Sequence, residues 1–349
     1  MAKQRHVLVT GGAGAIGSRL VGRLLQSSEV ERVVVVDDLS SGYEWLLPDD
    51  RRVELVRQDV ATLADADLRL EAPTIFHLAA FFANQNSVDH PLEDLHTNGR
   101  GTLATLMYAQ RCGARRLVYA SAGCSIAGHS HNGPIHEEMP VSLELDTPYQ
   151  ITKALGEFYC NYFLPQVSTV RCRFFNSYGP GEVPGQYRNV IPNFIWLALH
   201  DRPLPITGTG QETRDFIFVD DLVEGLMLAA QRPEAHGQAI NLGTGIQTRI
   251  EDLAKMIIDL CGSRSVVEYQ PPRAWDKSKH REANIDRARN LLGFRPQVKV
   301  PQGLERTVAW FRQNLSRIEA VVGAAGGMAA SVAPANAIEK LARSGSVRA

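Results

Sequence analysis

The chain opens with an apolar run that gives way to closely spaced glycines. His6-Val-Leu-Val-Thr10 has the pattern of a short buried strand, Gly11-Gly-Ala-Gly-Ala-Ile-Gly17 follows it, and Leu20 and Leu24 then recur at helical spacing. Glycines at this point let the backbone turn sharply and approach a pyrophosphate at the helix N-terminus, where free N–H groups favour anions. The order strand, glycine turn, helix therefore predicts a dinucleotide-binding α/β fold.

Within the glycine turn, we expect Gly11, Gly14, Ala15, Ile16 and Gly17 to contact the dinucleotide. Their backbone N–H groups lie at the start of the predicted helix, and glycine adds no side chain to hinder the approach.

A second apolar run, Arg32-Val-Val-Val-Val-Asp37-Asp38, ends in two acids. A carboxylate at the end of the second strand suits the 2′-hydroxyl of an adenosine ribose and repels a 2′-phosphate. The sequence therefore favours NAD over NADP as the cofactor. Asp37 is the better candidate for the ribose contact, and one of the two aspartates is alternatively a turn cap.

Strands then alternate with helices along the first half of the chain. The expected elements are a third strand at Val53–Val60, a fourth at Thr74–Ala80, a helix from Asn98 to about Arg111, a fifth strand at Arg116–Ser121, a helix from Tyr149 to about Phe163 and a sixth strand at Thr169–Phe175. This alternation predicts a Rossmann-type, doubly wound parallel sheet that is covered on both faces, with ligands beyond the carboxyl ends of its strands. Asp59, with Val60 beside it, is expected at the adenine edge, and Leu78, Ala79 and Ala80 leave room for a ligand.

The sequence pattern changes after Asn176, where turn-rich segments separate shorter helices and strands. We expect residues 1–180 to form the NAD-binding domain, rejoined by a segment near 216–232, and residues 181–316 to form mainly a smaller substrate-binding lobe. Residues 317–349 are poor in aromatic side chains and are expected to be a low-complexity tail, either a loose helix or disordered.

Tyr149 and Lys153 stand four residues apart in the predicted helix from Tyr149 to Phe163, so they share one helix face. A cation close to a phenol favours the phenolate and lowers its pKa, which would make Tyr149 a base for a sugar or alcohol hydroxyl. Lys153 is the only lysine between Lys3 and Lys255. Arginine cannot share a proton readily, whereas lysine can, so the use of lysine here favours a catalytic pair over an ordinary solvated helix face.

Composition excludes several classes of function. The net charge of −1 argues against nucleic acid or an anionic membrane as the main partner, and no apolar run approaches the length of a membrane span. The five cysteines are scattered without the spacing of a metal site, so no metal is expected. Residues Met1–His6 lead straight into a strand-like run without the pattern of a signal peptide, and a reduced, cytoplasmic setting is expected.

Taken together, residues 5–315 resemble the extended short-chain dehydrogenase/reductase superfamily, specifically its NAD-dependent nucleotide-sugar epimerases and dehydratases. The matching segments, in order, are Thr10–Gly17, Asp37, Asp59-Val60, His77-Leu-Ala-Ala80, Asn98 with Gly101-Thr102, Tyr149 with Lys153, Arg173–Pro180, Arg214–Asp220 and Asn241–Gly245.

The resemblance implies roles for individual residues. Tyr149 would be the acid/base and Lys153 would hold the nicotinamide ribose, with Asn98 among the cofactor-binding residues. Asn176 would contact the sugar or its first phosphate, while Arg214 and Arg281 would bracket the diphosphate. For Arg214 the alternative is a structural ion pair with Asp215 or Asp220. The family also implies a homodimer built through two helices per subunit, one of them the Tyr149 helix.

One loop departs from the family pattern. Relatives carry a second Ser or Thr after the fifth strand, and its hydroxyl holds the reacting oxygen of the substrate. Here the chain reads Ser121-Ala-Gly-Cys124-Ser125-Ile-Ala-Gly128. Counting from the strand puts Ala122 at the hydroxyl's place, and counting back from Gly128 puts Gly123 there. Ser121, Cys124 or Ser125 would have to substitute.

The same loop lacks acids between Ser121 and His136, where 4,6-dehydratases carry an Asp-Glu pair and sugar-acid decarboxylases a Glu. The leading hypothesis is therefore an NAD-dependent C4 epimerase of a nucleotide-diphospho-sugar, acting through a transient 4-keto intermediate. Alternatives are a 3,5-epimerase or epimerase/reductase assisted by Cys124, a 4,6-dehydratase, and a dinucleotide-sensing regulatory protein without turnover. Cys124 is alternatively a small buried thiol that packs beside the nicotinamide.

Overall fold

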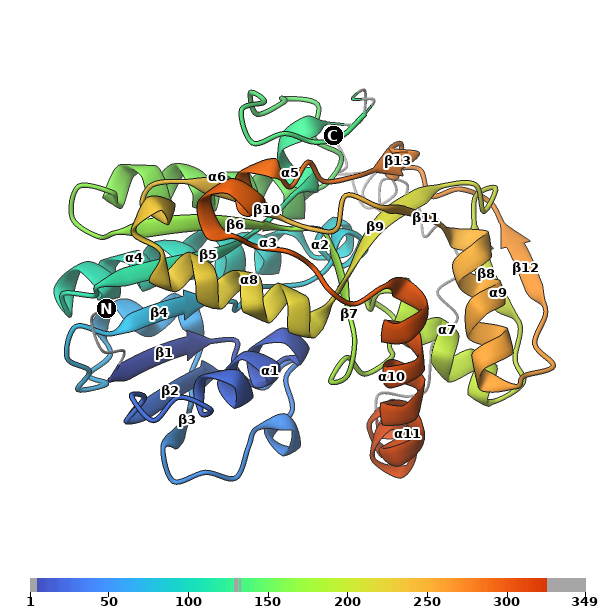
Figure 1. Ribbon diagram of the computed structural model, residues 1–349, viewed down its shortest axis with the longest axis horizontal. Helices are drawn as coiled ribbons and strands as arrows, with labels where there is room; N and C mark the ends of the chain where they lie inside the picture. The colour runs from blue at the N-terminus through green and yellow to red at the C-terminus, as the bar shows by residue number, and fades with distance from the viewer. Residues whose placement is uncertain (1–4, 129–130, 132, 325–349) are drawn as a thin grey trace, which may run out of the picture.

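A seven-stranded parallel sheet forms the centre of the computed structural model, which describes residues 5–324 apart from residues 129, 130 and 132 (Figure 1). The strand order is β3-β2-β1-β4-β5-β6-β10. The strands are β1 (His6–Thr10), β2 (Arg32–Asp37), β3 (Val53–Arg57), β4 (Thr74–His77), β5 (Arg116–Ala122), β6 (Thr169–Phe174) and β10 (Ala239–Leu242). The predicted Rossmann-type sheet is confirmed, and its first six strands begin at the expected residues. The expected ends of the third and fourth strands, Val60 and Ala80, are wrong, because β3 ends at Arg57 and β4 at His77.

Alternate residues of each central strand pack on opposite faces of the sheet, as the two-residue period of a strand requires. Val7 and Val9 belong to one hydrophobic cluster, whereas Leu8 between them belongs to another. Helices α1 (Ala15–Leu24) and α8 (Val219–Gln231) pack against each other and lie on the first face. The other face is covered by α4 (Gly101–Arg111) and α6 (Pro148–Phe163). Both faces are therefore buried.

The remaining elements of this half lie in the connections between strands. They are η1 (Glu44–Leu46), η2 (Val60–Asp65), α2 (Asn84–Asp89), α3 (Pro91–Asp94), η3 (Leu95–Arg100) and α5 (Cys124–Ala127).

The second half of the chain contributes two small sheets beside the carboxyl ends of the central strands (Figure 1). One contains β7 (Asn176–Tyr178), β9 (Thr213–Phe218), β11 (Gln247–Arg249) and β13 (His280–Arg281), and the other pairs β8 (Leu204–Thr207) with β12 (Val267–Gln270). The helices are α7 (Val190–Leu199), η4 (Pro233–Ala235), α9 (Ile250–Cys261), η5 (Ala288–Leu292), α10 (Val300–Gln313) and α11 (Leu315–Ala324).

Within the segment near 216–232, which was expected to return to the sheet, α8 packs against α1, β5 and β6. Strand β10 then adds to the sheet beside β6, a pairing that the sequence analysis did not predict. The division of the chain at residues 180 and 316 stays a prediction. Residues 317–324 belong to α11, where Ile318 and Val322 are buried, and residues 325–349 lie outside the described part of the chain.

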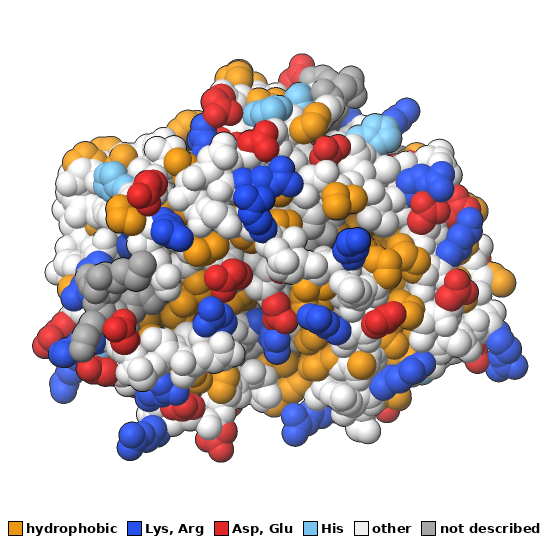
Figure 2. Space-filling view, viewed as in Figure 1, with side chains coloured by type: hydrophobic (Ala, Val, Ile, Leu, Met, Phe, Trp, Pro, Cys, Tyr) orange, Lys and Arg blue, Asp and Glu red, His pale blue; other side chains and the backbone are white. Residues whose placement is uncertain are grey.

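Charged side chains of both signs are interspersed on the face shown in Figure 2, without a field of a single sign. Among the described residues, no helix combines the length and the apolarity needed to cross a bilayer.

Candidate active site

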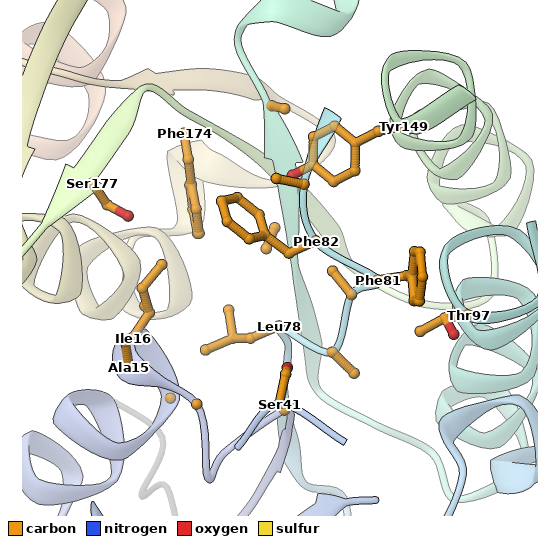
Figure 3. Close-up of a pocket in the computed structure, with 18 of the residues that line it drawn as sticks. Ala15, Ile16, Ser41, Leu78, Phe81, Phe82, Thr97, Tyr149, Phe174 and Ser177 are labelled. Carbon is orange, nitrogen blue, oxygen red and sulfur yellow. The ribbon is translucent and has the colours of Figure 1, made fainter. Parts of the chain in front are cut away.

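A cleft with a volume of about 370 Å³ lies at the carboxyl ends of the central strands. Its wall is made by the glycine turn before α1, the end of β2, the segment between β4 and α2, the end of β5, the start of α6 and the β6–β7 segment. In Figure 3 the Tyr149 ring enters the cavity beside Phe82, and Ile16 and Leu78 lie on the side facing the glycine turn. The predicted location of the ligand site, beyond the strand ends, is where the structure has its cleft.

The glycine turn is a cradle in which a side chain would not fit. Gly11 has a φ of +68°, and a Cβ there would lie 2.6 Å from the backbone nitrogen of Ala79. A Cβ on Gly17 would lie 2.2 Å from the carbonyl oxygen of Gly11. Gly14, Ala15 and Ile16 line the cleft at the start of α1, whose first-turn N–H groups are not used inside the helix. The turn fits the pyrophosphate of a dinucleotide.

Asp37 and Asp38 both line the cleft and both cap turns. The Asp37 carboxylate accepts hydrogen bonds from the backbone N–H groups of Ala13 (3.0 Å) and Leu39 (2.9 Å). Burial raises the pKa of Asp37, although these two N–H groups oppose the shift. Asp38 is exposed and accepts from the backbone nitrogen of Ser40 at 2.9 Å. The acidic end of β2 therefore lies at the cleft, as expected for a ribose contact.

Two predicted cofactor residues lie outside the cleft. The carboxylate of Asp59 caps η2 by accepting from the backbone nitrogen of Ala61 and pairs with His96 at 2.7 Å. Its sequence neighbours Gln58 and Val60 line the cleft instead. Asn98 is buried and its amide oxygen accepts from the Phe81 backbone nitrogen at 2.9 Å, so it holds the segment after β4 in place. Leu78, Ala79 and Ala80 of that segment line the cleft.

The N-terminus of α6 delivers Tyr149 and Lys153 to the cleft. Thr147 is the N-cap and its hydroxyl accepts from the backbone nitrogen of Gln150, while Pro148 occupies the first helical position, where a missing N–H costs nothing. The backbone nitrogen of Tyr149 donates to the Ser87 hydroxyl at 3.0 Å. Both members of the predicted pair line the cleft.

The predicted effect of Lys153 on the pKa of Tyr149 is not found in this structure. Burial raises the pKa of Tyr149, with the neighbouring Cys124 and Asp94 adding to the rise. The Lys153 Nζ donates to the carbonyl oxygen of Ala120 at 2.9 Å and lies 5.7 Å from the centre of the Tyr149 ring. Burial also lowers the pKa of Lys153 to about 8, which weakens its charge. The lysine is poised to share a proton, but the phenol stays protonated here.

Among the described side chains of residues 121–128, no hydroxyl faces the cleft freely. Ser121 lines the cleft, but its Oγ donates to the buried Glu157 Oε1 at 2.6 Å. A Cβ on Gly123 would lie 2.5 Å from the Phe175 ring, so this glycine accommodates the ring rather than a larger substrate. Cys124 lines the cleft. Ser125 lies in α5, and its side chain is outside the described part of the chain.

The predicted diphosphate-binding residues are only partly assembled at the cleft. Asn176 and Arg281 line it, whereas Arg214 is buried behind it. Asp276 accepts from the Nη2 atoms of both Arg214 (3.0 Å) and Arg281 (3.3 Å). The ion pair of Arg214 is thus with Asp276, and not with Asp215 or Asp220 as the alternative reading expected. Burial, with the nearby Arg281, lowers the pKa of Arg214 to about 10.

The structure adds cleft residues that the sequence analysis did not single out. Phe81, Phe82 and Phe174 form apolar walls (Figure 3), and Asn84 and Glu182 contribute polar groups. Burial raises the pKa of Glu182 to about 7. Two signals in the sequence were available: the run Phe81–Asn86 directly follows the expected fourth strand, and Glu182 follows a glycine-rich turn after the sixth.

Similar proteins include enzymes of two activities. The UDP-glucose 4-epimerase of Mycolicibacterium smegmatis is 37% identical over 319 residues, covering 88% of this chain and 99% of that protein. UDP-glucuronic acid decarboxylase 1 of Xenopus tropicalis is 32% identical over 322 residues, covering 89% of this chain and 73% of that protein. The solved structure of epimerase Mth375 from Methanothermobacter thermautotrophicus gives a TM-score of 0.87 at 47% identity, covering 90% of this chain and 94% of that one.

The family model described as the NAD dependent epimerase/dehydratase family matches residues 7–243. The glycine cradle and the acidic end of β2 fit the dinucleotide that this family uses. The chain is a member of the NAD dependent epimerase/dehydratase family, whose members are enzymes that act on nucleotide sugars, and its cofactor is NAD.

Proposed function

We propose that the protein is an NAD-dependent epimerase that inverts C4 of a UDP-sugar. One observation carries the proposal: Tyr149 and Lys153 enter a cleft in which the carboxylates among the described lining residues are confined to Asp37, Asp38 and Glu182. Asp37 is the last residue of β2 and Asp38 follows it, while Glu182 follows Gly181, whose backbone approaches Ala15 at the glycine turn. An oxidation that needs only a proton acceptor and a hydride acceptor matches this set of residues.

The chain's own residues supply proton transfer and orientation. Tyr149 would accept the proton of the 4-hydroxyl and later return it, with Lys153 beside it to balance the charge. When bound, oxidised NAD brings a positively charged ring and exchanges a hydride with the sugar carbon. A positive charge near Tyr149 favours its phenolate, so we expect the pKa of Tyr149 to fall only in the holoenzyme.

The 4-keto sugar must turn over before it is reduced on its other face. Phe81, Phe82 and Phe174 offer apolar surfaces that hold no hydroxyl of the sugar in one orientation. Asn176 and Arg281 would hold the diphosphate while the sugar moves.

A second candidate rests on the position of Cys124 in the cleft wall. A thiol in that place is able to exchange protons at carbons next to a 4-keto group, which would make the protein a 3,5-epimerase. Dehydration and decarboxylation have less support, because the described part of the β5–α5 loop supplies no acid. A cofactor-sensing protein without turnover has the least support, since the Tyr149 and Lys153 pair is retained.

The test is to incubate the holoenzyme with UDP-hexoses in D₂O and to follow the sugar signals by NMR. Inversion at C4 with protium retained at every ring carbon supports the proposal. Deuterium at C3 or C5 that is lost in Cys124→Ala supports the second candidate, and a persistent 4-keto-6-deoxy product would establish a dehydratase.

We also propose that two copies of the chain associate through α4 and α6. Ile151, Phe158 and Tyr162 recur on one face of α6 and are 55–75% exposed, and Met107 on the adjacent α4 is 47% exposed. Large apolar side chains gathered on two neighbouring helices are typical of an interface, and a second copy offers the same self-complementary surface.

A further inference from the structure

Asn84 occupies a place beside the catalytic tyrosine. It is the first residue of α2 and lines the cleft. Residues on either side of it contact Tyr149: the Phe82 ring meets the Tyr149 ring edge-on at 6.3 Å, and the Ser87 hydroxyl accepts from the Tyr149 backbone nitrogen. The segment from Phe82 to Ser87 therefore wraps the start of α6, with Asn84 in its middle.

In this structure the Thr147 hydroxyl holds the amide oxygen of Asn84. The Thr147 hydroxyl accepts from the backbone nitrogen of Gln150 and keeps its own proton to donate, and the Asn84 Oδ1 accepts that proton at 2.8 Å. The NH₂ group of Asn84 is not bonded to Thr147 and donates to none of the described side chains, so it is available to a ligand in the cleft that Asn84 lines. The amide thus presents a pair of N–H donors whose direction is set by the N-cap of the catalytic helix.

A donor is needed at this end of the cleft. The Ser121 hydroxyl already donates its proton to Glu157, and Ala122 and Gly123 have no hydroxyl. A sugar oxygen that loses its proton to Tyr149 gains negative charge, and a hydrogen-bond donor fixed in advance stabilises that charge without reorganising.

We propose that the Asn84 side-chain amide donates a hydrogen bond to the hexose oxygen on which Tyr149 acts. This assigns Asn84 as a substrate-binding residue and rests on the proposed function. Asn84, in the segment between β4 and α2, would thus supply the donor that the described side chains of residues 121–123 do not.

The matched variants are Asn84→Asp and Asn84→Ala. Aspartate has the shape of asparagine and still accepts from Thr147, so the helix cap and the fold are kept, but its second oxygen accepts instead of donating. Alanine removes both groups. Asn290→Ala is the control, because Asn290 is an exposed asparagine in η5 outside the cleft.

The experiment measures binding of UDP-glucose and of UDP to each holoenzyme by calorimetry, and turnover of UDP-glucose by NMR. We expect Asn84→Asp to weaken UDP-glucose binding at least tenfold and UDP binding less than twofold, with bound NAD and melting temperature unchanged. We expect kcat to fall at least thirtyfold in Asn84→Asp and by a smaller factor in Asn84→Ala. In Asn290→Ala we expect kcat to stay at the wild-type value.

Equal effects on UDP and UDP-glucose, or no effect on either, would overturn the assignment. The affinity measurements do not depend on turnover, so the role of Asn84 and the proposed epimerase function are tested separately. A wild-type enzyme that leaves C4 unchanged contradicts the proposed function, while a sugar-specific loss of affinity in Asn84→Asp still supports the role of Asn84.

Discussion

The hydroxyl of Ser121 donates to Oε1 of Glu157 at 2.6 Å, inside the core and next to the cleft. The same carboxylate receives two hydrogen bonds from Arg173, each of 2.8 Å. Ser121 lies on β5, Glu157 on α6 and Arg173 on β6, so this buried network fixes α6 against two strands of the sheet. We therefore expect Ser121 to position α6 rather than to contact the substrate.

Removing the Ser121 hydroxyl tests that role. Because Ser121→Ala leaves Glu157 with its two bonds to Arg173, we expect the free energy of unfolding to fall by about 2 kcal/mol, the size of a hydrogen bond to a charged group. Turnover at a temperature where the variant is folded is expected to stay within about fivefold of wild type. Urea unfolding and initial rates check both, and a loss of more than a hundredfold in kcat would place the hydroxyl on the substrate.

The acidic end of β2 makes a prediction about cofactor choice. In Asp37→Asn a repulsive charge is lost and one backbone N–H loses its acceptor, so we expect NAD to bind about tenfold more weakly and the preference over NADP to shrink. Asp38→Asn should show the smaller effect, because Asp38 is exposed. Fluorescence titration with both cofactors measures this, and a larger effect from Asp38→Asn would reverse the assignment of the ribose contact.

Glu182 gives the protein a defined pH dependence. Its pKa rises from the usual 4.5 to about 7 because it is buried, against the opposing influence of Arg188 and Asn189. The folded state then binds more protons than the unfolded state between pH 4.5 and 7, so stability is lost as the pH rises through this window. Glu182→Gln cannot ionise, and its stability advantage over wild type should grow to about 3 kcal/mol by pH 8. If the difference in free energy of unfolding between Glu182→Gln and the wild type were the same at pH 5 and pH 8, this prediction would be wrong.

The proposed interface predicts a change of mass. Phe158→Glu combined with Tyr162→Glu places two charges on the exposed face of α6, where a second copy would have to bury them. Light scattering should show the wild type at twice 38.4 kDa and the double variant at 38.4 kDa. Tyr269→Glu, at another exposed aromatic residue on β12, should leave the mass of the wild type unchanged. A wild type already at the single-chain mass would refute the interface.

Local patterns in the sequence were sufficient for the first six strands of the sheet and for the glycine turn at the cleft. The run from His6 to Gly17 forms the strand and turn that it predicts, because its glycines occupy positions where a Cβ collides with backbone atoms. Asp37, Tyr149 and Lys153 reach the cleft because a strand end and a helix N-terminus bring them there.

The rest depends on contacts between distant segments, which spacing along the chain does not encode. Strand β10 has four residues and is a strand because β6 offers an edge to it. Ser121 looked like a free hydroxyl, but its partner Glu157 lies on another element. Likewise, the spacing of Tyr149 and Lys153 predicted a lowered pKa for Tyr149. In the structure burial raises that pKa, and the Lys153 ammonium donates to the carbonyl of Ala120.

In the proposed reaction, the Tyr149 hydroxyl moves the proton that permits oxidation at C4. The most direct measurement is the rate of interconversion of UDP-glucose and UDP-galactose by the wild type and by Tyr149→Phe, each loaded with NAD to the same occupancy. We predict a loss of at least a thousandfold in kcat with unchanged affinity for UDP, because the variant lacks only the group that exchanges the proton. A Tyr149→Phe enzyme that retains a tenth or more of the wild-type rate would contradict the account.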